Sequence, residues 1–463
     1  MPRIADRSLW AWAALGLAGS VLIAVAAPQV AGGPVKWWFD PSLGGAGVAI
    51  FYAGIVVLSI AWLGLGLLAL APGQVGIVGA LWCLPLFLSA PLFSQDAYSY
   101  LAQGTIVHLG LDPYRDAPAV LAQHGQAHVL SAVSPFWRHT TAPYGPLFLW
   151  IVSWFSDAGP VVGVLLIRVL ELLGFALLAV FVPRLARSIG ADPGRAAWLV
   201  LLSPLVLLEL VAAAHNDLLM IGLVVAGVAF AIERRVILGI ALCALAATIK
   251  LPAAAAIPFI LVAVAPDRRT VWQALLVTVG VVLAVSLVSG LGLGWISSAV
   301  FSTPAKVRLA ITPATALGWT IAQVVPVGAR GLESALAVVA FALSVVLAVT
   351  LLWRVRRATL VRYLGVALLA VAVAGPAAWP WYLSWGLVLL ACCREVQRSR
   401  ALVVALIATA LVVKADGILV FPLHTAPGFV VLYVALAVVA FVSLRRPATA
   451  GRRRWRARAV AES

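Results

Sequence analysis

Residues 159–183 read GPVVGVLLIRVLELLGFALLAVFVP, in which only Arg168 and Glu171 carry charge. A helix needs about 20 predominantly apolar residues to cross the hydrocarbon core of a bilayer. Runs of this kind recur along the 463-residue chain, in which 64% of the residues are hydrophobic and 10% are charged. A soluble domain of this length does not contain so large an apolar fraction. The sequence therefore predicts an all-α, polytopic integral membrane protein.

The apolar runs predict about 12 to 14 transmembrane helices, because the stretches 236–266 and 363–393 are each short for two spans. Many spans follow the first run, so we interpret it as an uncleaved helix and not as a signal peptide. The four cysteines lie in or at the ends of apolar runs, and their spacing favours neither a metal site nor a disulfide framework. The expected spans lie near 9–27, 45–70, 74–92, 159–183, 196–213, 217–232, 236–249, 252–266, 271–292, 331–353, 363–379, 381–393, 401–416 and 428–444.

The net charge of +16 lies in short arginine clusters between the spans and in the last 20 residues. This distribution is typical of cytoplasmic loops and not of a nucleic-acid-binding surface, so we expect no nucleic acid partner. We expect one transmembrane domain over 1–463, with extracytoplasmic loops at 93–158 and 293–330. The basic cytoplasmic tail, 445–463, is expected to bind anionic membrane lipids. The aromatic stretch 147–156 favours a short helix in the membrane interface.

Polar side chains gather on the predicted outer face, where all six histidines lie. Asp96 directly follows an apolar span and opens the 93–158 loop. A carboxylate is costly beside lipid, which makes Asp96 a candidate for function, with a helix cap or an interfacial aspartate as the alternative. Within the spans, Arg168 and Glu171 are three residues apart on one helix, a spacing at which they can pair with each other. A polar face on one side favours chemistry or recognition there over a transport path through the spans.

Six short motifs carry a resemblance to a known family, and the resemblance covers about residues 80 to 395. The motifs are SQDAYSYLAQG (94–104), GLDPY (110–114), TAPYGPL (141–147), HND (215–217), IKLP (249–252) and WPWY (379–382). Through them the chain is similar to the actinobacterial polyprenol-phosphomannose-dependent α-1,6-mannosyltransferases, which are membrane glycosyltransferases of the GT-C class.

The resemblance implies a GT-C-like enzyme in the plasma membrane with its active site on the extracytoplasmic side. It would move mannose from polyprenyl-phosphate mannose to a lipid-linked mannan, forming α-1,6 links with inversion, and would thus have a glycolipid acceptor as partner. In the family an acidic residue of an early outer loop is the catalytic base, which maps onto Asp96. Many GT-C enzymes carry Asp-X-Asp or Glu-X-Asp, whereas this chain has Gln95-Asp96 followed by Ala97-Tyr98. We therefore expect no cofactor, and a bound divalent metal ion stays open as an alternative that these residues do not support.

The chemistry of glycosyl transfer suggests further site residues. A leaving lipid phosphate needs cations, and we expect it to be bound by Arg308, Lys306, His215 and Lys250. The alternative for each is an ordinary interfacial charge that reaches to water. We expect the substrates to contact Tyr98, Gln103, His139, Tyr144 and Asp217. Asp217 has the alternative role of a carboxylate at a helix N-terminus.

Three other functions remain open on the sequence alone. The same class of enzyme can use polyprenyl-phospho-arabinose or polyprenyl-phospho-glucose as donor. A transporter or flippase for polyprenyl-linked sugars requires polar residues along the spans, which are scarce here. A non-catalytic scaffold of an envelope-assembly complex is distinguished from an enzyme by the effect of removing the Asp96 carboxylate.

Overall fold

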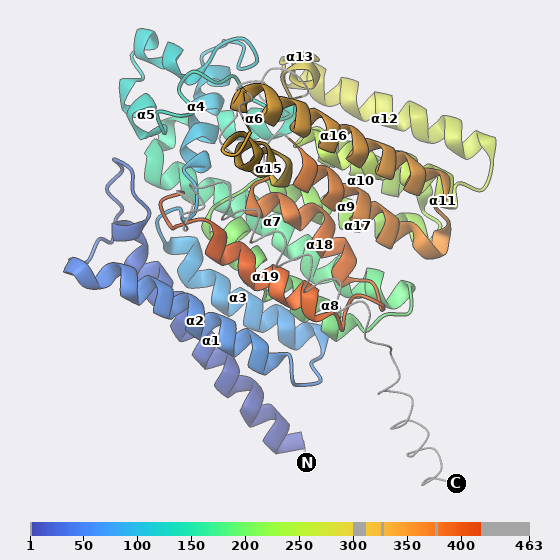
Figure 1. Cartoon of the computed structure of the whole chain (residues 1–463), viewed down its shortest axis with the longest axis horizontal. Coiled ribbons are helices and arrows are strands. Elements are labelled where there is room, and N and C mark those ends of the chain that lie inside the picture. The colour runs from blue at the N-terminus through green and yellow to red at the C-terminus, as the bar shows by residue number, and fades with distance from the viewer. Residues whose placement is uncertain (1, 300–311, 326–327, 376–377, 418–463) are drawn as a thin grey trace.

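The computed structural model describes residues 2–299, 312–325, 328–375 and 378–417. These residues form helices and no β-strand, which confirms the all-α class. Figure 1 shows most of the long helices running alongside one another. Helices α1 (Pro2–Val30), α2 (Gly47–Leu65) and α3 (Pro72–Leu88) lie together along one side.

Six of the described helices are long and apolar enough to cross a membrane. Helix α8 (Pro193–Leu201) and the π-helix Leu205–Ala212 form one more span if the pair, bent by 46°, crosses as a unit. These findings confirm a multi-pass membrane protein. The total number of crossings stays a prediction, and the expected span 428–444 lies outside the described residues. The six long helices are α1, α2, α7 (Gly159–Ser188), α12 (Arg268–Val288), α16 (Ala329–Trp353) and α17 (Leu360–Ala374).

Shorter apolar helices complete the described bundle, and two of them consist of a 3₁₀ turn followed by an α-helix. They are α3, α9 (Asp217–Ile232), α10 (Val236–Ala247), α11 (Ala256–Val264) after Leu251–Ala255, α18 (Ser384–Ala391) after Pro380–Leu383, and α19 (Arg400–Val412). Between α3 and α7 the chain forms α4 (Asp96–His108), a 3₁₀ helix (Pro118–His124), α5 (Ala127–Ala132) and α6 (Pro146–Ser153). The remaining described α-helices are α13 (Gly294–Ser297) and α15 (Pro313–Ala322).

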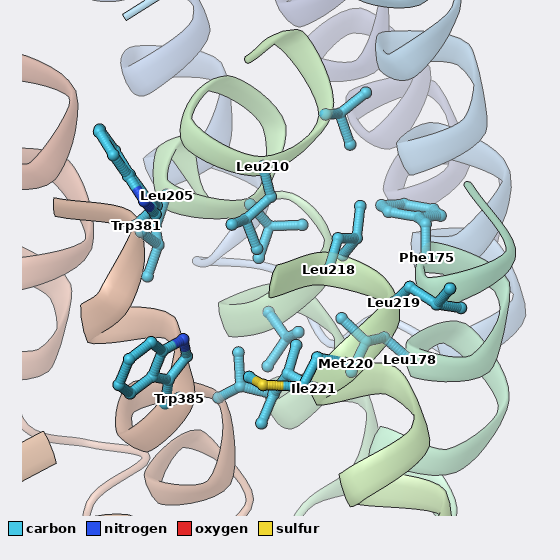
Figure 2. Close-up of a cluster of buried hydrophobic side chains, with 14 of the residues drawn as sticks. Phe175, Leu178, Leu205, Leu210, Leu218, Leu219, Met220, Ile221, Trp381 and Trp385 are labelled. Atoms are coloured by element: carbon cyan, nitrogen blue, oxygen red, sulfur yellow. The ribbon is translucent and has the colours of Figure 1, made fainter. Parts of the chain in front are cut away.

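Helices α7 and α9 pack closely because each contributes a glycine to the contact. A Cβ atom on Gly174 would lie 2.4 Å from the carbonyl oxygen of Leu218, and one on Gly222 would lie 2.7 Å from that of Gly174. Buried side chains of α9, including Met220 and Ile221, lie among apolar residues of α7 and α18 (Figure 2). This packing fixes the N-terminal end of α9, where the candidate site begins.

The predicted pairing of Arg168 with Glu171 is wrong. The Nη1 atom of Arg168 donates hydrogen bonds to the carbonyl oxygens of Phe87 and Ser89, and its Nη2 atom donates to that of Ala212. Glu171 accepts a hydrogen bond from the backbone N–H of Leu219, 3.0 Å away. A buried charged side chain needs hydrogen-bond partners, and the ends of helices provide backbone N–H and C=O groups that have no partner within the helix. Arg168 thus ties the end of α3 to the end of the π-helix.

The aromatic stretch 147–156 contains the predicted short helix, since α6 spans Pro146–Ser153. Phe148 and Leu149 are fully buried, and α6 packs against α4. Its location in a membrane interface stays a prediction. The contact places the end of the 93–158 loop beside the helix that begins with Asp96.

Candidate active site

Asp96 is the first residue of α4 and follows a strained turn. Phe93 has a φ of +63°, a conformation that residues other than glycine rarely adopt. The backbone N–H of Phe93 donates to the carbonyl oxygen of Ala415 at 2.8 Å, which fixes the turn to the segment that follows α19. The Oγ atom of Ser94 then accepts a hydrogen bond from the N–H of Asp96 at 3.0 Å. A carboxylate in the first turn is favoured by the free N–H groups of the helix end.

A second strained turn, at Ala214, directly precedes the His-Asn-Asp motif. In a continuing π-helix the N–H of Ala214 would bond the carbonyl oxygen of Glu209. Ala214 instead has a φ of +58° and its N–H bonds the carbonyl oxygen of Val211. The side chain of His215 uses the Glu209 carbonyl oxygen, which lies 2.5 Å from His215 Nδ1. The helix end therefore determines how the imidazole is oriented.

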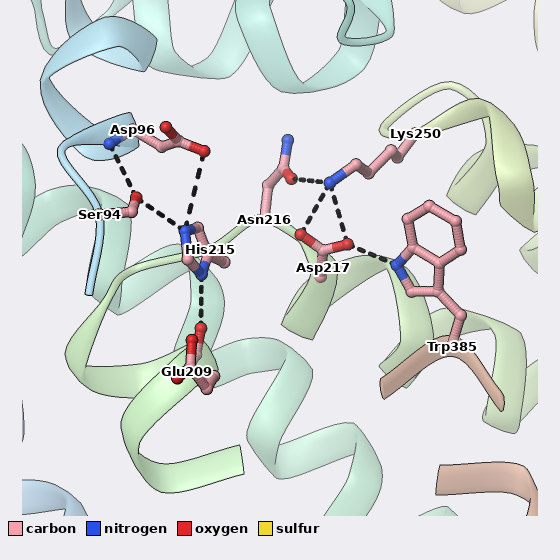
Figure 3. Close-up of polar contacts among 8 residues, drawn as sticks. All are labelled: Ser94, Asp96, Glu209, His215, Asn216, Asp217, Lys250 and Trp385. Carbon is pink, nitrogen blue, oxygen red and sulfur yellow. Dashed lines mark hydrogen bonds and ion pairs between the residues drawn. The ribbon is translucent and has the colours of Figure 1, made fainter. Parts of the chain in front are cut away.

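The two strained turns meet through Ser94 and His215. The Nδ1 atom of His215 faces a carbonyl oxygen and must carry hydrogen, so the Nε2 atom of the neutral ring is an acceptor. The Ser94 hydroxyl, 2.9 Å from Nε2, donates to it. The nearest carboxylate oxygen of Asp96 lies 3.8 Å from the same nitrogen. Figure 3 shows Ser94, Asp96 and His215 converging. The ring of Trp381 stacks on His215 with 4.0 Å between centroids.

Burial reverses the usual order of the pKa values of Asp96 and His215, so that the pKa of the carboxyl group lies above that of the imidazole. It raises the pKa of Asp96, which is 6% exposed, to about 6, against a smaller opposing effect of Lys250. It lowers the pKa of the fully buried His215 to about 4. A proton that enters this pair is held by the carboxyl group, and the imidazole stays neutral.

Asp217 and Lys250 form a buried ion pair next to this cluster. The Lys250 Nζ atom lies 2.9 and 2.8 Å from the two carboxylate oxygens of Asp217, which is fully buried. The indole N–H of Trp385 donates to Asp217 at 2.5 Å. Lys250 also donates to the side-chain oxygen of Asn216 at 3.5 Å. The ion pair and these extra hydrogen bonds offset the free-energy cost of burying the two charges, whereas burying either charge alone would be strongly destabilising.

Aromatic rings enclose the ammonium group. The Lys250 Nζ atom lies 4.5 Å from the ring centroid of Tyr382, 5.6 Å from that of Trp385 and 5.7 Å from that of Tyr144. Tyr144 precedes Gly145, a position at which the packing leaves room only for glycine. A Cβ on Gly145 would lie 2.1 Å from the carbonyl oxygen of Thr248. The N–H of Gly145 also donates to the carbonyl oxygen of Ile249 at 2.9 Å, so the TAPYGPL and IKLP motifs lie in direct contact.

The structure brings together five of the predicted site residues, namely Asp96, Tyr144, His215, Asp217 and Lys250. Gln103 is buried seven residues after Asp96 and therefore lies on the same face of α4. Tyr98 is two residues from Asp96, points to another side of α4, and lines a small cavity with Leu101 and Thr105. His139 is exposed and makes no hydrogen bond or ion pair within the described part of the chain. Lys306 and Arg308 lie outside the described residues.

Two predicted roles require correction. His215 was expected to bind phosphate, but it is fully buried and both ring nitrogens already have protein partners. Asp217 was expected to contact substrate, but both carboxylate oxygens are used by Lys250 and one also by Trp385. Sequence reasoning also left Ser94, Asn216 and Trp385 out of the predicted site. Ser94 and Asn216 each lie within one of the quoted motifs, whereas nothing in the sequence points from Trp385 to Asp217.

Comparisons with known proteins identify the family of the chain. A family model described as "alpha-(1->6)-mannopyranosyltransferase, N-terminal domain" matches residues 12–266, and one described as "MptB C-terminal domain" matches residues 311–446. The chain belongs to the α-(1→6)-mannopyranosyltransferase family. It is 35% identical to α-(1→6)-mannopyranosyltransferase A of Mycobacterium tuberculosis, over 88% of this chain and 84% of the relative. As a member of this family the protein is a glycosyltransferase.

Two further relatives support the same membership. A probable α-(1→6)-mannopyranosyltransferase of Mycolicibacterium smegmatis is 33% identical, over 81% of this chain and 78% of the relative. A second α-(1→6)-mannopyranosyltransferase of Mycobacterium tuberculosis is 31% identical, over 86% and 80% respectively. No solved structure matches the chain. The cluster around Asp96 is therefore the candidate active site of this member of the mannosyltransferase family.

Proposed function

We propose that this protein transfers mannose from polyprenyl-phosphate mannose to a lipid-linked mannan and forms an α-1,6 link with inversion. Family membership supports the sugar and the linkage, since the relatives carry the name α-(1→6)-mannopyranosyltransferase. One observation carries the chemical assignment. Asp96 is a buried carboxylate with a raised pKa that two strained turns hold against a neutral histidine.

Asp96 is the catalytic base in this proposal. The acceptor hydroxyl oxygen forms a bond to the anomeric carbon while the bond from that carbon to the donor phosphate oxygen breaks. The hydroxyl proton passes to Asp96, and the bonding electrons leave with the phosphate. A base works best when its pKa is near the operating pH, which burial of Asp96 provides. His215 stays neutral and acts as a positioning residue through Ser94.

The leaving lipid phosphate carries the developing negative charge and needs no proton. Lys250 is close enough to lower the pKa of Asp96, so the base and the cation share one site. We assign stabilisation of the phosphate to Lys250, held in place by Asp217 and the surrounding rings. Lys306 and Arg308, predicted from the 293–330 loop, keep the same proposed role.

The site is proposed to face the extracytoplasmic side of the plasma membrane. Arginines of the described chain concentrate at the C-terminal end of α7 and in the turns after α9, α16 and α18, and Asp96 lies in the segment between α3 and α7 on the opposite side of the predicted topology. Arginine-rich short loops mark the cytoplasmic side. A lipid-linked donor and a glycolipid acceptor would then both reach Asp96 from the outer leaflet.

Sugar transfer by the purified protein in lipid vesicles tests this function. Labelled mannose is supplied on polyprenyl phosphate or on a nucleotide, with parallel samples of polyprenyl-phospho-glucose and polyprenyl-phospho-arabinose. We expect product from the polyprenyl-phosphate mannose alone, with an α-1,6 link by NMR. Product from one of the other lipid-linked sugars would overturn the donor sugar. Movement of the lipid-linked sugar between leaflets without any glycosidic product would overturn the enzyme mechanism in favour of a flippase.

A further inference from the structure

Asn216 lies between Asp96, the proposed base, and Lys250, the proposed cation. Its buried side-chain NH₂ group has no hydrogen-bond acceptor within the described residues. The residue is fully buried and directly precedes α9. Figure 3 shows its side chain between Asp96 and Lys250. Within the described residues the Nδ2 atom of Asn216 has no hydrogen-bond partner. A buried N–H group without an acceptor costs free energy, so it calls for an explanation.

The orientation of the amide follows from Lys250. The ammonium group can only donate hydrogen bonds, so the amide oxygen of Asn216 must face it, 3.5 Å away. Flipping the amide would place its NH₂ group against an ammonium group, with two donors facing each other. The NH₂ group is therefore held away from Lys250. Because Lys250 is itself bonded to Asp217, this orientation is fixed by the buried ion pair.

The strained backbone before Asn216 maintains this placement. Ala214 has a φ of +58°, and His215 is bound on both ring nitrogens. Residues in rare backbone conformations persist where surrounding structure fixes them, and they cluster at functional sites. The segment 214–217 thus presents a neutral donor beside a cation, which is a combination suited to an oxyanion.

We propose that the Asn216 NH₂ group binds a phosphate oxygen of the lipid-linked sugar donor. This inference rests on the proposed function, because it takes the donor to be a glycosyl phosphate. Lys250 lies next to the oxygen of the same amide, and its positive charge favours a phosphate oxygen over a sugar hydroxyl as the acceptor of the NH₂ group. Asn216 would then contact the donor in the ground state and the leaving group in the transition state.

Two variants of Asn216 test the proposal through donor binding, which is measured without turnover. Donor binding is followed by the protection that polyprenyl phosphate alone gives against thermal unfolding, which does not depend on transfer. Loss of a hydrogen bond to a charged group predicts about 10- to 100-fold weaker binding for Asn216→Ala. Asn216→Asp, which has the same shape, is expected to bind even more weakly because its carboxylate repels phosphate. Gln123→Ala, an exposed amide in the same loop as Asp96, is the control and should bind normally.

The outcomes separate this inference from the proposed function. Unchanged polyprenyl phosphate binding by Asn216→Ala would overturn the role of Asn216. Near-normal polyprenyl phosphate binding by Asn216→Asp, with weak binding by Asn216→Ala, would mean that the shape of the side chain matters and not a hydrogen bond to phosphate, and would overturn the phosphate assignment. Failure of the wild-type protein to bind polyprenyl phosphate while it binds another glycosyl donor would instead overturn the proposed function.

Discussion

Ser94 and His215 are joined by a hydrogen bond of 2.9 Å between Oγ and Nε2, although 121 positions separate them in the chain. Each follows a non-glycine residue in the left-handed region, Phe93 and Ala214 respectively. The bond therefore links two turns, each of which contains a residue in a strained backbone conformation. Because the same Ser94 oxygen accepts from the N–H of Asp96, the link fixes the start of α4 and with it the proposed base.

Removal of this link should slow the chemical step more than it weakens binding. In Ser94→Ala the Asp96 N–H loses its acceptor and His215 loses its donor. A small misplacement of a reacting group can cost about 100-fold in rate, so we expect kcat to fall by about 10- to 100-fold with the donor KM unchanged. Ser131→Ala, an exposed hydroxyl on α5, is the control. A wild-type kcat in Ser94→Ala would show that this bond does not position Asp96.

The pH dependence of transfer should report the raised pKa of Asp96. The base must be ionised to accept a proton, so kcat/KM is expected to rise with pH along an acid limb with its midpoint near the pKa of about 6. Asp217 works to raise this pKa and Lys250 to lower it, and burial outweighs both. The pKa of His215 lies at about 4, so its titration should add no limb at higher pH. A midpoint near the ordinary aspartate value of about 3.9 would contradict the assignment.

The buried pair of Lys250 and Asp217 should behave as a unit in stability. Lys250→Met leaves the Asp217 carboxylate buried without its cation, and loss of one partner of such a pair costs about 3–5 kcal/mol. The double variant Lys250→Met/Asp217→Asn removes both charges and should recover most of that loss. Thermal unfolding in detergent measures the effect. Equal destabilisation by the single and double variants would show that the ion pair is not coupled.

Arg168 should contribute to stability through the three carbonyl groups that it binds. Arg168→Met leaves the carbonyl oxygens of Phe87, Ser89 and Ala212 without this donor. Each unsatisfied buried group costs about 1–3 kcal/mol, so we expect a total of several kcal/mol. Arg187→Met, an exposed arginine on the same helix, is the control. If Glu171 were the true partner, Glu171→Gln would destabilise the protein as strongly as Arg168→Met, which this structure does not predict.

The sequence predicted the helical class and the position of Asp96 because both follow from local patterns. Apolar runs determine which segments enter a membrane, and a carboxylate directly after such a run marks the point where the chain leaves it. The motif His215-Asn216-Asp217 was also recognisable as a polar break between apolar segments. These features depend on neighbours in the sequence.

The internal arrangement of the site depends on contacts that no local pattern encodes. Asp217 is paired with Lys250 and Trp385, which lie 33 and 168 positions away. The left-handed conformation of Ala214 has no sequence signal, because glycine is the residue normally expected there. This conformation frees the Glu209 carbonyl for His215 and so removes the histidine from phosphate binding. The spacing of Arg168 and Glu171 predicted a pair, but helix ends elsewhere in the chain offered both groups closer partners.

The central claim is that Asp96 accepts the proton of the acceptor hydroxyl, and single-turnover transfer by Asp96→Asn tests it most directly. Purified wild type and variant are mixed with labelled polyprenyl-phosphate mannose and a short lipid-linked mannoside, and donor binding is confirmed by protection against thermal unfolding. Removal of a general base costs about 100- to 10,000-fold in rate. We predict that Asp96→Asn folds, binds the donor and transfers mannose at least about 100-fold more slowly than wild type. Transfer at the wild-type rate by a variant that binds donor normally would contradict the account.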